Sequence, residues 1–341
     1  MRKKNNPEWG NSLRRLPWDN DAAATESERL ISSTLHEWYD AKHPKVSLDE
    51  IALINSLTVK QCPYCGSKHF IRCGHYGNGI QRYQCRACNH RFTTLTNTIF
   101  EDKKIPISEW IEYLIHLFEF HSLTTSTRDN RNAESTGKYW LIKVFTVLKD
   151  IQKDVVLEGN IYFDETYFPV VKSKIVTKSG KKLRGVSRNK IGVAVAFDDQ
   201  GQFILNVEYT SKPSDRSTWT AMGSHIKPES HLIHDGERSH GVLIRNLKLT
   251  SEVYSSEYTK NLKDEDNPLY PINHIHYLAK RFMREHGGYN RDNLQDWMNL
   301  FWFILSKPVN RYEKVRNFID LAVCTPERVK FRDVMCKKQN K

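Results

Sequence analysis

Two Cys-x-x-Cys pairs constrain the fold of this chain more than any other feature of its sequence. Cys62 and Cys65 form the first pair, and Cys85 and Cys88 form the second pair nineteen residues further on. Two thiolates spaced in this way can bind one metal ion at a tight turn, and two such turns complete a tetrahedral zinc site. Because protein ligands would fill all four positions, we expect the zinc to be structural rather than catalytic.

The residues around the two pairs favour a small β-ribbon. Pro63 and Gly66 frame the first turn, Asn89 follows the second, and aromatic and β-branched residues between the pairs suit short strands. Two disulfides are the alternative, but the basic N-terminus lacks the apolar core of a signal peptide and the other cysteines are scattered. Cys73 and His75 are alternative ligands that we expect to take no part.

Length and charge indicate the class of partner. The chain has 341 residues and a formal net charge of +12, and it holds no apolar run long enough to span a membrane. We therefore expect a cytoplasmic, nucleoid-associated protein with a polyanionic partner. Residues 172–190 hold eight Lys or Arg and no acid, so Lys181, Lys182, Arg184 and Arg188 are candidate phosphate contacts. A solvated hairpin is the alternative for this run.

The spacing of apolar residues predicts a multidomain α/β protein, with a helix near residues 25–38 and a hairpin at 190–210 that turns at residues 198–201. An amphipathic helix headed by Ser108 and a second helix from about Glu134, with a polar turn between them, suit either a helix-turn-helix or a plain linker. We expect five segments: a partly helical N-terminal segment at 1–58, the zinc ribbon at 59–98, a helical DNA-binding or linker region at 99–157, a mixed α/β catalytic domain at 158–306 and a C-terminal tail at 307–341.

Two aspartates are expected at the ends of apolar strands in the catalytic domain. Asp164 follows Phe163 in YFDET, and Asp235 follows a short apolar run in LIHDGE. The order of strands and helices around them matches a ribonuclease-H-like layout, in which acids converge at one edge of the sheet. Two neighbouring carboxylates can hold Mg²⁺ or Mn²⁺ for phosphodiester chemistry. The alternatives are a local hydrogen bond for Asp164 and an Asp-Gly turn for Asp235.

A helix beginning near Ile272 offers a third group of candidate residues. Asn273, His276 and Lys280 are three and four residues apart, so they share one face of that helix. A neighbouring apolar stripe would pack on the sheet and present Asn273 and His276 to the two aspartates, with Lys280 directed to a phosphate. The alternative is an ordinary solvated polar face.

Several blocks together resemble a known family. The cysteine pairs, YFDETYF, HDGERSH, N-x-x-H-x-x-x-K and GGYNRDNLQDWMNLFWF are similar to bacterial insertion-sequence transposases of the IS1595 type, which carry a zinc ribbon and an ISXO2-like catalytic domain. The resemblance covers about residues 45–306. It implies a DDE-type transposase that uses catalytic Mg²⁺ or Mn²⁺ at Asp164 and Asp235. The implied partners are double-stranded DNA, namely the terminal inverted repeats and the target. The resemblance also implies a homo-oligomer that acts in a synaptic complex.

The third catalytic position departs from the Asp-Asp-Glu pattern of this resemblance. His276 is the first choice for the third ligand, Asn273 is its rival, and Glu285 lies beyond the matched position. A neutral imidazole or amide removes one negative charge from the metal site, and an imidazole prefers softer metals than magnesium. Two alternative functions therefore remain: a DNA-binding protein whose catalytic centre has decayed, and a nuclease that cleaves without strand transfer.

Overall fold

The computed structural model describes residues 27, 30, 50–77, 79–101, 107–129, 132–169, 190–286 and 289–335. The predicted helix near residues 25–38 lies almost entirely outside these residues. The basic run at 172–190 does so too, with the candidate DNA contacts Lys181, Lys182, Arg184 and Arg188.

Contacts divide the chain into two compact units. Unit 1 comprises Met1–His116, Leu123–Tyr139 and Asn317–Lys341, and unit 2 comprises Leu117–Ser122 and Trp140–Arg316. None of the helices among the described residues is both long enough and apolar enough to cross a membrane.

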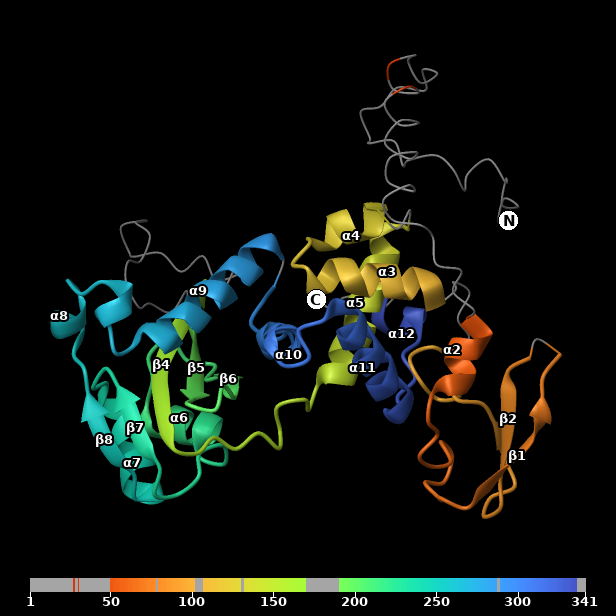
Figure 1. The fold of residues 1–341 in the computed structure, drawn as a ribbon, viewed down its shortest axis with the longest axis horizontal. Coiled ribbons are helices and arrows are strands. Elements are labelled where there is room, and N and C mark those ends of the chain that lie inside the picture. The colour runs from red at the N-terminus through yellow and green to blue at the C-terminus, as the bar shows by residue number, and fades with distance from the viewer. Residues whose placement is uncertain are drawn as a thin grey trace. The chain divides into compact units, whose positions relative to one another are not determined.

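From residue 50 on, unit 1 contains a short helix and a small antiparallel sheet (Figure 1). These elements are α2 (Glu50–Ser56), β1 (Phe70–His75), β2 (Gln81–Cys85) and β3 (Arg91–Phe92). The rings of Phe70, Tyr83 and Phe92 lie 5.6–5.7 Å apart and pack beside buried cysteine side chains. Asn55 of α2 donates to the Gly79 carbonyl (3.0 Å) and ties the helix to the hairpin. The predicted ribbon strands are therefore present around a very small core.

The helices after the ribbon differ from the prediction in two respects. They are α3 (Ile107–Phe118), α4 (Leu123–Asp129) and α5 (Glu134–Leu148), so a helix occupies the segment predicted as a polar turn. Ser108 lies inside α3 and does not precede it as a cap. A Cβ at Gly137 would lie 1.8 Å from Thr127 Cγ2, so glycine is needed for the close approach of α4 and α5.

Unit 2 is built on a five-stranded mixed sheet (Figure 1). In spatial order the strands are β6 (Phe203–Val207), β5 (Lys190–Asp198), β4 (Asn160–Pro169), β7 (His231–His234) and β8 (Thr250–Val253). The first three strands along the chain form an antiparallel meander, and β7 and β8 then run parallel to β4. The central strand β4 therefore has one antiparallel and one parallel neighbour.

Helices pack against this sheet, and the sheet face of a residue follows from strand alternation. Ile161 and Phe163 of β4 join the core formed with α6 (Asp215–Met222) and α7 (Gly241–Leu247). Asp164 points to the opposite face, toward α9 (Tyr270–Glu285). Unit 2 also contains α8 (Ser256–Thr259) and α10 (Leu294–Leu305). Helix α11 (Arg311–Cys324) spans the boundary between the units, and α12 (Phe331–Met335) belongs to unit 1.

The mixed α/β character and the predicted hairpin of the catalytic region are confirmed. Strands β5 and β6 are joined at the Asp-Asp-Gln-Gly turn, with Gly201 at φ +85°. Strand β8 and helix α7 were not predicted, and the C-terminal tail contains α11 and α12. Asp164 lies inside β4 rather than at its end, which corrects the prediction for that residue.

Candidate functional site

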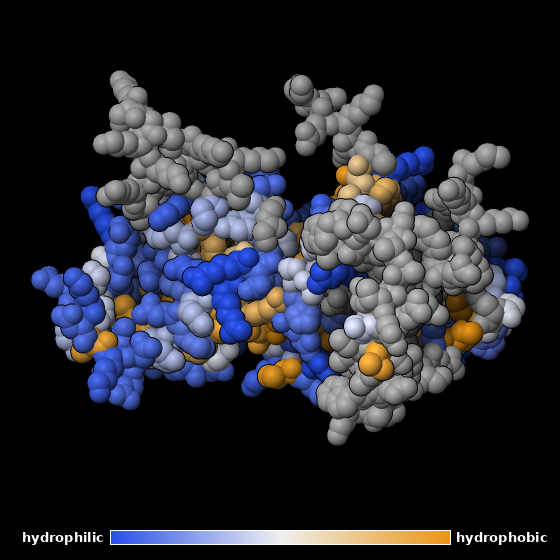
Figure 2. All heavy atoms as spheres, turned by 90° about the horizontal axis from the view of Figure 1, so that it is seen from above, coloured by the Kyte–Doolittle hydropathy of each residue, from blue (hydrophilic) through white to orange (hydrophobic). Residues whose placement is uncertain are grey.

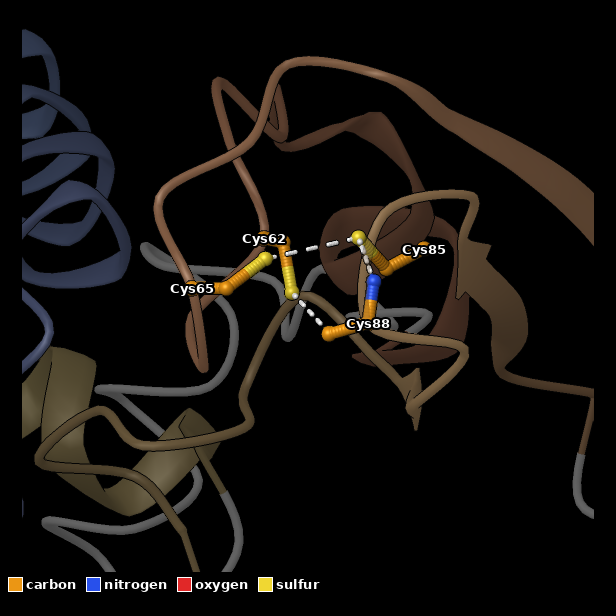
Figure 3. Close-up of side chains that lie close together, drawn as sticks. All are labelled: Cys62, Cys65, Cys85 and Cys88. Carbon is orange, nitrogen blue, oxygen red and sulfur yellow. Dashed lines mark hydrogen bonds between the residues drawn. The ribbon is translucent and has the colours of Figure 1, made fainter.

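The four cysteines of the two pairs converge on one point (Figure 3). Their sulfur atoms all lie within 4.8 Å of one another, and Cys73 and His75 do not belong to the cluster. The Sγ atoms of Cys62 and Cys88 are 3.7 Å apart, and those of Cys65 and Cys85 are 3.6 Å apart. A tetrahedral site with metal–sulfur bonds of about 2.3 Å separates its sulfurs by about 3.8 Å. The cluster therefore has the dimensions of a four-thiolate metal site and is too wide for disulfides.

The two turns that carry these cysteines have the same backbone construction. Gly66 donates its N–H to the Cys62 carbonyl (2.9 Å), and Asn89 donates to the Cys85 carbonyl (3.0 Å). Both residues have positive φ, +72° and 61°, which glycine and asparagine adopt more readily than most residues. The backbone N–H of Cys88 is the main cause that lowers the pKa of the Cys85 thiol to about 6, which favours the metal-binding thiolate.

Asp164 and Asp235 are brought together by the parallel pairing of β4 and β7. The last register pair is Phe163 with His234, so the next residues along the two strands are the two aspartates. Strand β4 continues past Asp164 beside β5, whereas β7 ends before Asp235. The ladder between β4 and β7 thus ends where the two carboxylates lie, although Asp164 is in the interior of its own strand.

The carboxyl group of Asp164 is in an unfavourable electrostatic environment. Burial and the neighbouring charges of Asp235 and Glu165 raise its pKa to about 7. Its Oδ1 atom accepts from the Glu165 N–H (2.8 Å), which opposes this shift only in part. Asp235 Oδ1 likewise accepts from the Glu237 N–H (2.9 Å). Carboxylates gathered in this way suit a hard divalent cation, which would relieve their mutual repulsion.

His276 extends from α9 toward Asp164. Its Nδ1 atom lies 3.8 Å from Asp164 Oδ2, and its side chain is 8% exposed. Burial and the nearby charge of Lys280 lower the pKa of His276 to about 3, so the imidazole is neutral near pH 7. Its Nε2 atom is buried and has no hydrogen-bond partner within the described residues. A neutral imidazole with an unused ring nitrogen can act as a metal ligand.

Asn273 and Lys280 lie on the same helix but are exposed to solvent. No hydrogen bond or ion pair joins either side chain to the two aspartates within the described residues. Lys280 is close enough to influence His276 electrostatically. Glu285 is also exposed, at the last residue of α9. Of the predicted third ligands, His276 is the one that contacts an aspartate.

A buried network behind the aspartates was missed by sequence reasoning. His240 Nε2 lies 3.1 Å from Glu165 Oε1, and its Nδ1 atom lies 2.9 Å from His234 Nδ1. The same Nδ1 atom is 3.7 Å from Asp235 Oδ1. Glu165, His234 and His240 are all buried. Glu165 is adjacent to Asp164 on the strand, so this network lies on the α6 and α7 side of the sheet.

Burial and neighbouring charges shift the pKa values of the two histidines in this network in opposite directions. Burial alone would lower the pKa of His240, but its bond to Glu165 and the charges of Glu165 and Asp235 outweigh burial and raise it. His234 accepts from the Gly236 N–H (3.2 Å) and from His240, and burial together with the His240 charge lowers its pKa to about 4. The raised pKa favours the protonated form of His240 between Glu165 and Asp235, and the lowered pKa keeps His234 neutral near pH 7.

Glu208 is a further buried acid, close enough to Glu165 for the two charges to interact. It accepts from Thr218 Oγ1 (2.9 Å), and burial and the Glu165 charge raise its pKa to about 7. A Cβ on Gly192 would lie 3.2 Å from Glu208 Oε2, so a small residue on β5 makes room for it. In the sequence, the signals for this network were an acid directly after Asp164 and two histidines flanking Asp235. Only the strand pairing shows that these residues meet.

Comparison with known proteins found one informative relative. No family model matches the chain. The chain is 25% identical over 264 residues to an uncharacterised protein in the transposable element ISH50 of Halobacterium salinarum, and the alignment spans 70% of this chain and 83% of that protein. This chain is therefore similar to a protein encoded within a mobile DNA element.

Two solved structures align weakly. The Mos1 strand transfer complex shares 12% identity with a TM-score of 0.26, and the alignment covers 66% of this chain and 79% of that one. A pre-cleavage Mos1 transpososome shares 10% identity with a TM-score of 0.20, and the alignment covers 64% of this chain and 78% of that one. These scores are too low to indicate a shared fold.

Proposed function

We propose that this protein is a DDE-type DNA transposase of an insertion sequence and that it is similar to the transposases of IS1595-type elements. Its catalytic domain would be ribonuclease-H-like, with Asp164 and Asp235 as the acidic pair. The observation that carries the proposal is the meeting of these two carboxylates at the end of the β4–β7 ladder, opposite His276 of α9. Similarity to a protein of the ISH50 element supports it independently.

The residues at this edge of the sheet fit Mg²⁺ or Mn²⁺. Burial and the charges of Asp235 and Glu165 raise the pKa of Asp164, and oxygen ligands such as these carboxylates are those that the two ions prefer. A divalent cation bound there supplies polarisation of the phosphodiester and stabilisation of the leaving oxygen. Asp164 and Asp235 would hold it, His276 would add a neutral nitrogen ligand, and Asn273 remains the rival for that position.

The positively charged residues would hold the DNA. Lys280 lies on α9 near His276 and would contact a phosphate. Lys181, Lys182, Arg184 and Arg188 would do the same from the basic run. The partners would be the terminal inverted repeats and the target, both double-stranded. Because two element ends must be processed, we propose that the protein acts as a homo-oligomer in a synaptic complex.

The cysteine cluster would bind one structural Zn²⁺. Four sulfur ligands suit zinc, and with all four positions filled no open position remains for catalysis. This ribbon, at 59–98, and the helical region at 99–157 would recognise the inverted repeats, and the catalytic domain would span 158–306.

A strand-cleavage and strand-transfer assay tests the proposal. The substrate is DNA carrying the ends of the element that encodes this chain, with magnesium and manganese in parallel. We expect cleavage and joining by the native protein, and loss of both in Asp164→Asn. The exposed residue Asp154 provides a matched control, since Asp154→Asn removes a carboxylate away from the site.

The third ligand is tested in the same assay. If His276→Ala abolishes activity and Asn273→Ala does not, His276 is the ligand, and the reverse result assigns the role to Asn273. The neutral His276 at an expected carboxylate position also favours a second candidate, a DNA-binding protein with a decayed centre. Specific binding to the ends without any cleavage would support that candidate. Cleavage without joining would indicate a nuclease.

A further inference from the structure

One exposed stripe of helix α9 has no role in the site described above. Tyr270, His274, Tyr277, Arg281 and Arg284 follow one another at intervals of three or four residues, so they lie along a single face. All five are exposed to solvent. The apolar residues of the helix lie on its other side and are buried. We call these five residues the α9 stripe.

The aromatic rings of the α9 stripe form a short ladder. The rings of Tyr270 and His274 are 5.8 Å apart at 33°, and those of His274 and Tyr277 are 6.4 Å apart at 30°. Tyr270 is 40% exposed and Tyr277 is 55% exposed. Keeping large aromatic rings in water loses the stabilisation that burial would provide. Roughly parallel exposed rings offer faces on which other flat rings can stack.

Positive charge continues the stripe beyond the rings. Arg281 and Arg284 form no ion pair within the described residues, and the one acid on α9 is Glu285 at its last residue. Asp264, Glu265 and Asp266 precede the helix, so the cationic part of the stripe is its C-terminal half. Figure 2 shows mainly hydrophilic residues over the unit that carries α9. Along the stripe, flat aromatic rings come first and cationic side chains follow. A DNA strand is complementary to this order, because its bases can stack on the rings and its phosphates can pair with the arginines.

The α9 stripe lies next to the candidate catalytic residues. His276, which contacts Asp164, is adjacent in sequence to Tyr277. Successive residues of an α-helix are rotated by about 100° around its axis. This rotation places Asn273 and Lys280 between the stripe and His276 on the helix surface. A strand whose phosphate lies at the aspartates would therefore have neighbouring nucleotides within reach of this face of α9.

We propose that the α9 stripe binds unpaired bases of a DNA strand, next to the phosphate held at Asp164 and Asp235. This inference rests on the proposed transposase function and adds the state of the DNA at the site. In a duplex the bases are stacked on one another, so the rings of an exposed helix cannot reach their faces. In a single strand every base has a free face, and stacking on aromatic side chains is independent of sequence.

Equilibrium binding without added magnesium or manganese tests the inference apart from catalysis. The probes are a fluorescent oligothymidylate, a duplex of equal length, and a single strand containing 2-aminopurine, whose emission reports stacking. We expect Tyr277→Ala to weaken single-strand binding about tenfold and duplex binding by less than about twofold. Tyr277→Phe should bind like the native protein, because the ring remains.

Two further variants sharpen the experiment. Tyr258→Ala is the matched control, because Tyr258 is 59% exposed but lies on α8 outside the stripe. It should bind both probes normally. Arg281→Ala should reduce the slope of log affinity against log salt for the single strand by about 0.7, the value for one phosphate contact.

The outcomes separate this inference from the proposed function. Equal losses on single strand and duplex, or no loss in Tyr277→Ala, would overturn the stacking role. A change in sedimentation of the DNA-free protein, with single-strand binding intact, would instead assign the stripe to a contact between copies of the chain. If the native protein shows no cleavage of element ends but Tyr277-dependent single-strand binding persists, the transposase proposal fails and the α9 stripe assignment stands.

Discussion

Asp164 is held in an environment that disfavours its charge. Its side chain is 23% exposed, and burial together with the charges of Asp235 and Glu165 raises its pKa. The neighbouring His240 lowers the pKa of Asp164 and so opposes this repulsion only in part. Without a bound cation, the folded protein is therefore less stable than it would be with a neutral side chain at this position, as is common at functional sites.

The pH dependence of stability follows from this shift. The folded-state pKa of Asp164 is about 7 against an ordinary value of 3.8, so between these pH values the folded protein binds the proton more strongly than the unfolded chain. The contribution of Asp164 to the free energy of unfolding therefore falls as pH rises from about 4 to about 7. Without added magnesium or manganese, Asp164→Asn should raise that free energy by roughly 2 kcal/mol at pH 8, after allowance for partial exposure.

Urea unfolding at pH 8 and pH 4 measures this effect. At pH 4 Asp164 is already protonated in the folded protein, so the substitution should make little difference there. The exposed control Asp154→Asn should change stability little at either pH. A destabilised Asp164→Asn protein at pH 8 would contradict the prediction.

At the scale of single elements, two kinds of turn position the functional groups. The turn after β7 passes through Gly236 at φ +91°, and a Cβ there would lie 2.8 Å from Val253 Cγ1 of β8. The two cysteine turns repeat one backbone pattern around the sulfur cluster. In both cases the backbone conformation determines where a candidate ligand atom lies.

Gly236→Ala should disturb the turn that carries Asp235. Positive φ costs a non-glycine residue about 1–2 kcal/mol, and the contact with Val253 adds to this cost. Gly201→Ala is the matched control, because Gly201 has a similar φ of +85° but a Cβ there would meet no atom within 4 Å. Thermal unfolding should show a larger loss for Gly236→Ala, and cleavage should fall in that variant alone. Equal losses and unchanged cleavage would argue against a role for the turn.

The ribbon should depend on its metal. Its core contains few residues, namely Cys62, Tyr83, Cys85 and Phe92 with three partly buried neighbours, which is too small to fold without a further constraint. Cys85→Ser should therefore remove bound zinc and abolish slow amide exchange in β1 and β2. Cys73→Ser should leave both unchanged, since Cys73 is outside the cluster. Metal analysis and hydrogen exchange measure the two effects, and full zinc occupancy in Cys85→Ser would refute the prediction.

At the scale of the whole molecule, the net charge of +12 should govern the association with DNA that we propose. Affinity for duplex DNA should fall steeply with salt, because each phosphate contact releases counterions. Replacing both Lys181 and Lys182 with alanine should reduce the slope of log affinity against log salt by about 1.8, at about 0.9 per contact. Lys227→Ala should change it little, since Lys227 is paired with Glu158. A native slope for the double variant would exclude both lysines from the interface.

Local patterns in the sequence predicted the cysteine cluster, the β5–β6 hairpin and helix α9, because each depends on residues close together along the chain. Strand β8 was missed because it is short and all four of its residues are exposed, without the alternation of a half-buried strand. Helix α4 was missed because its Thr and Ser residues favour turns over helices.

The candidate site at the edge of the sheet was also predicted only in part, because it too depends on contacts between distant parts of the chain. Asp164 and Asp235 were recognised as a pair, but the link from Glu165 through His240 to Asp235 depends on pairing between strands some seventy residues apart. The spacing of apolar residues within either strand does not indicate that the two strands pair. The position of Asp164 inside its strand was also invisible, because the antiparallel partner of β4 supports residues beyond it.

That extension of β4 gives the two aspartates different freedom of movement. The backbone at Asp164 is continuous with a long ladder to β5, so displacing it would require the centre of the sheet to move. Asp235 stands beyond the last residue of β7, beside a glycine, where small rotations are possible without breaking a strand. The two aspartates therefore depend on different parts of the fold for their position, Asp164 on the pairing at the centre of the sheet and Asp235 on the turn at Gly236.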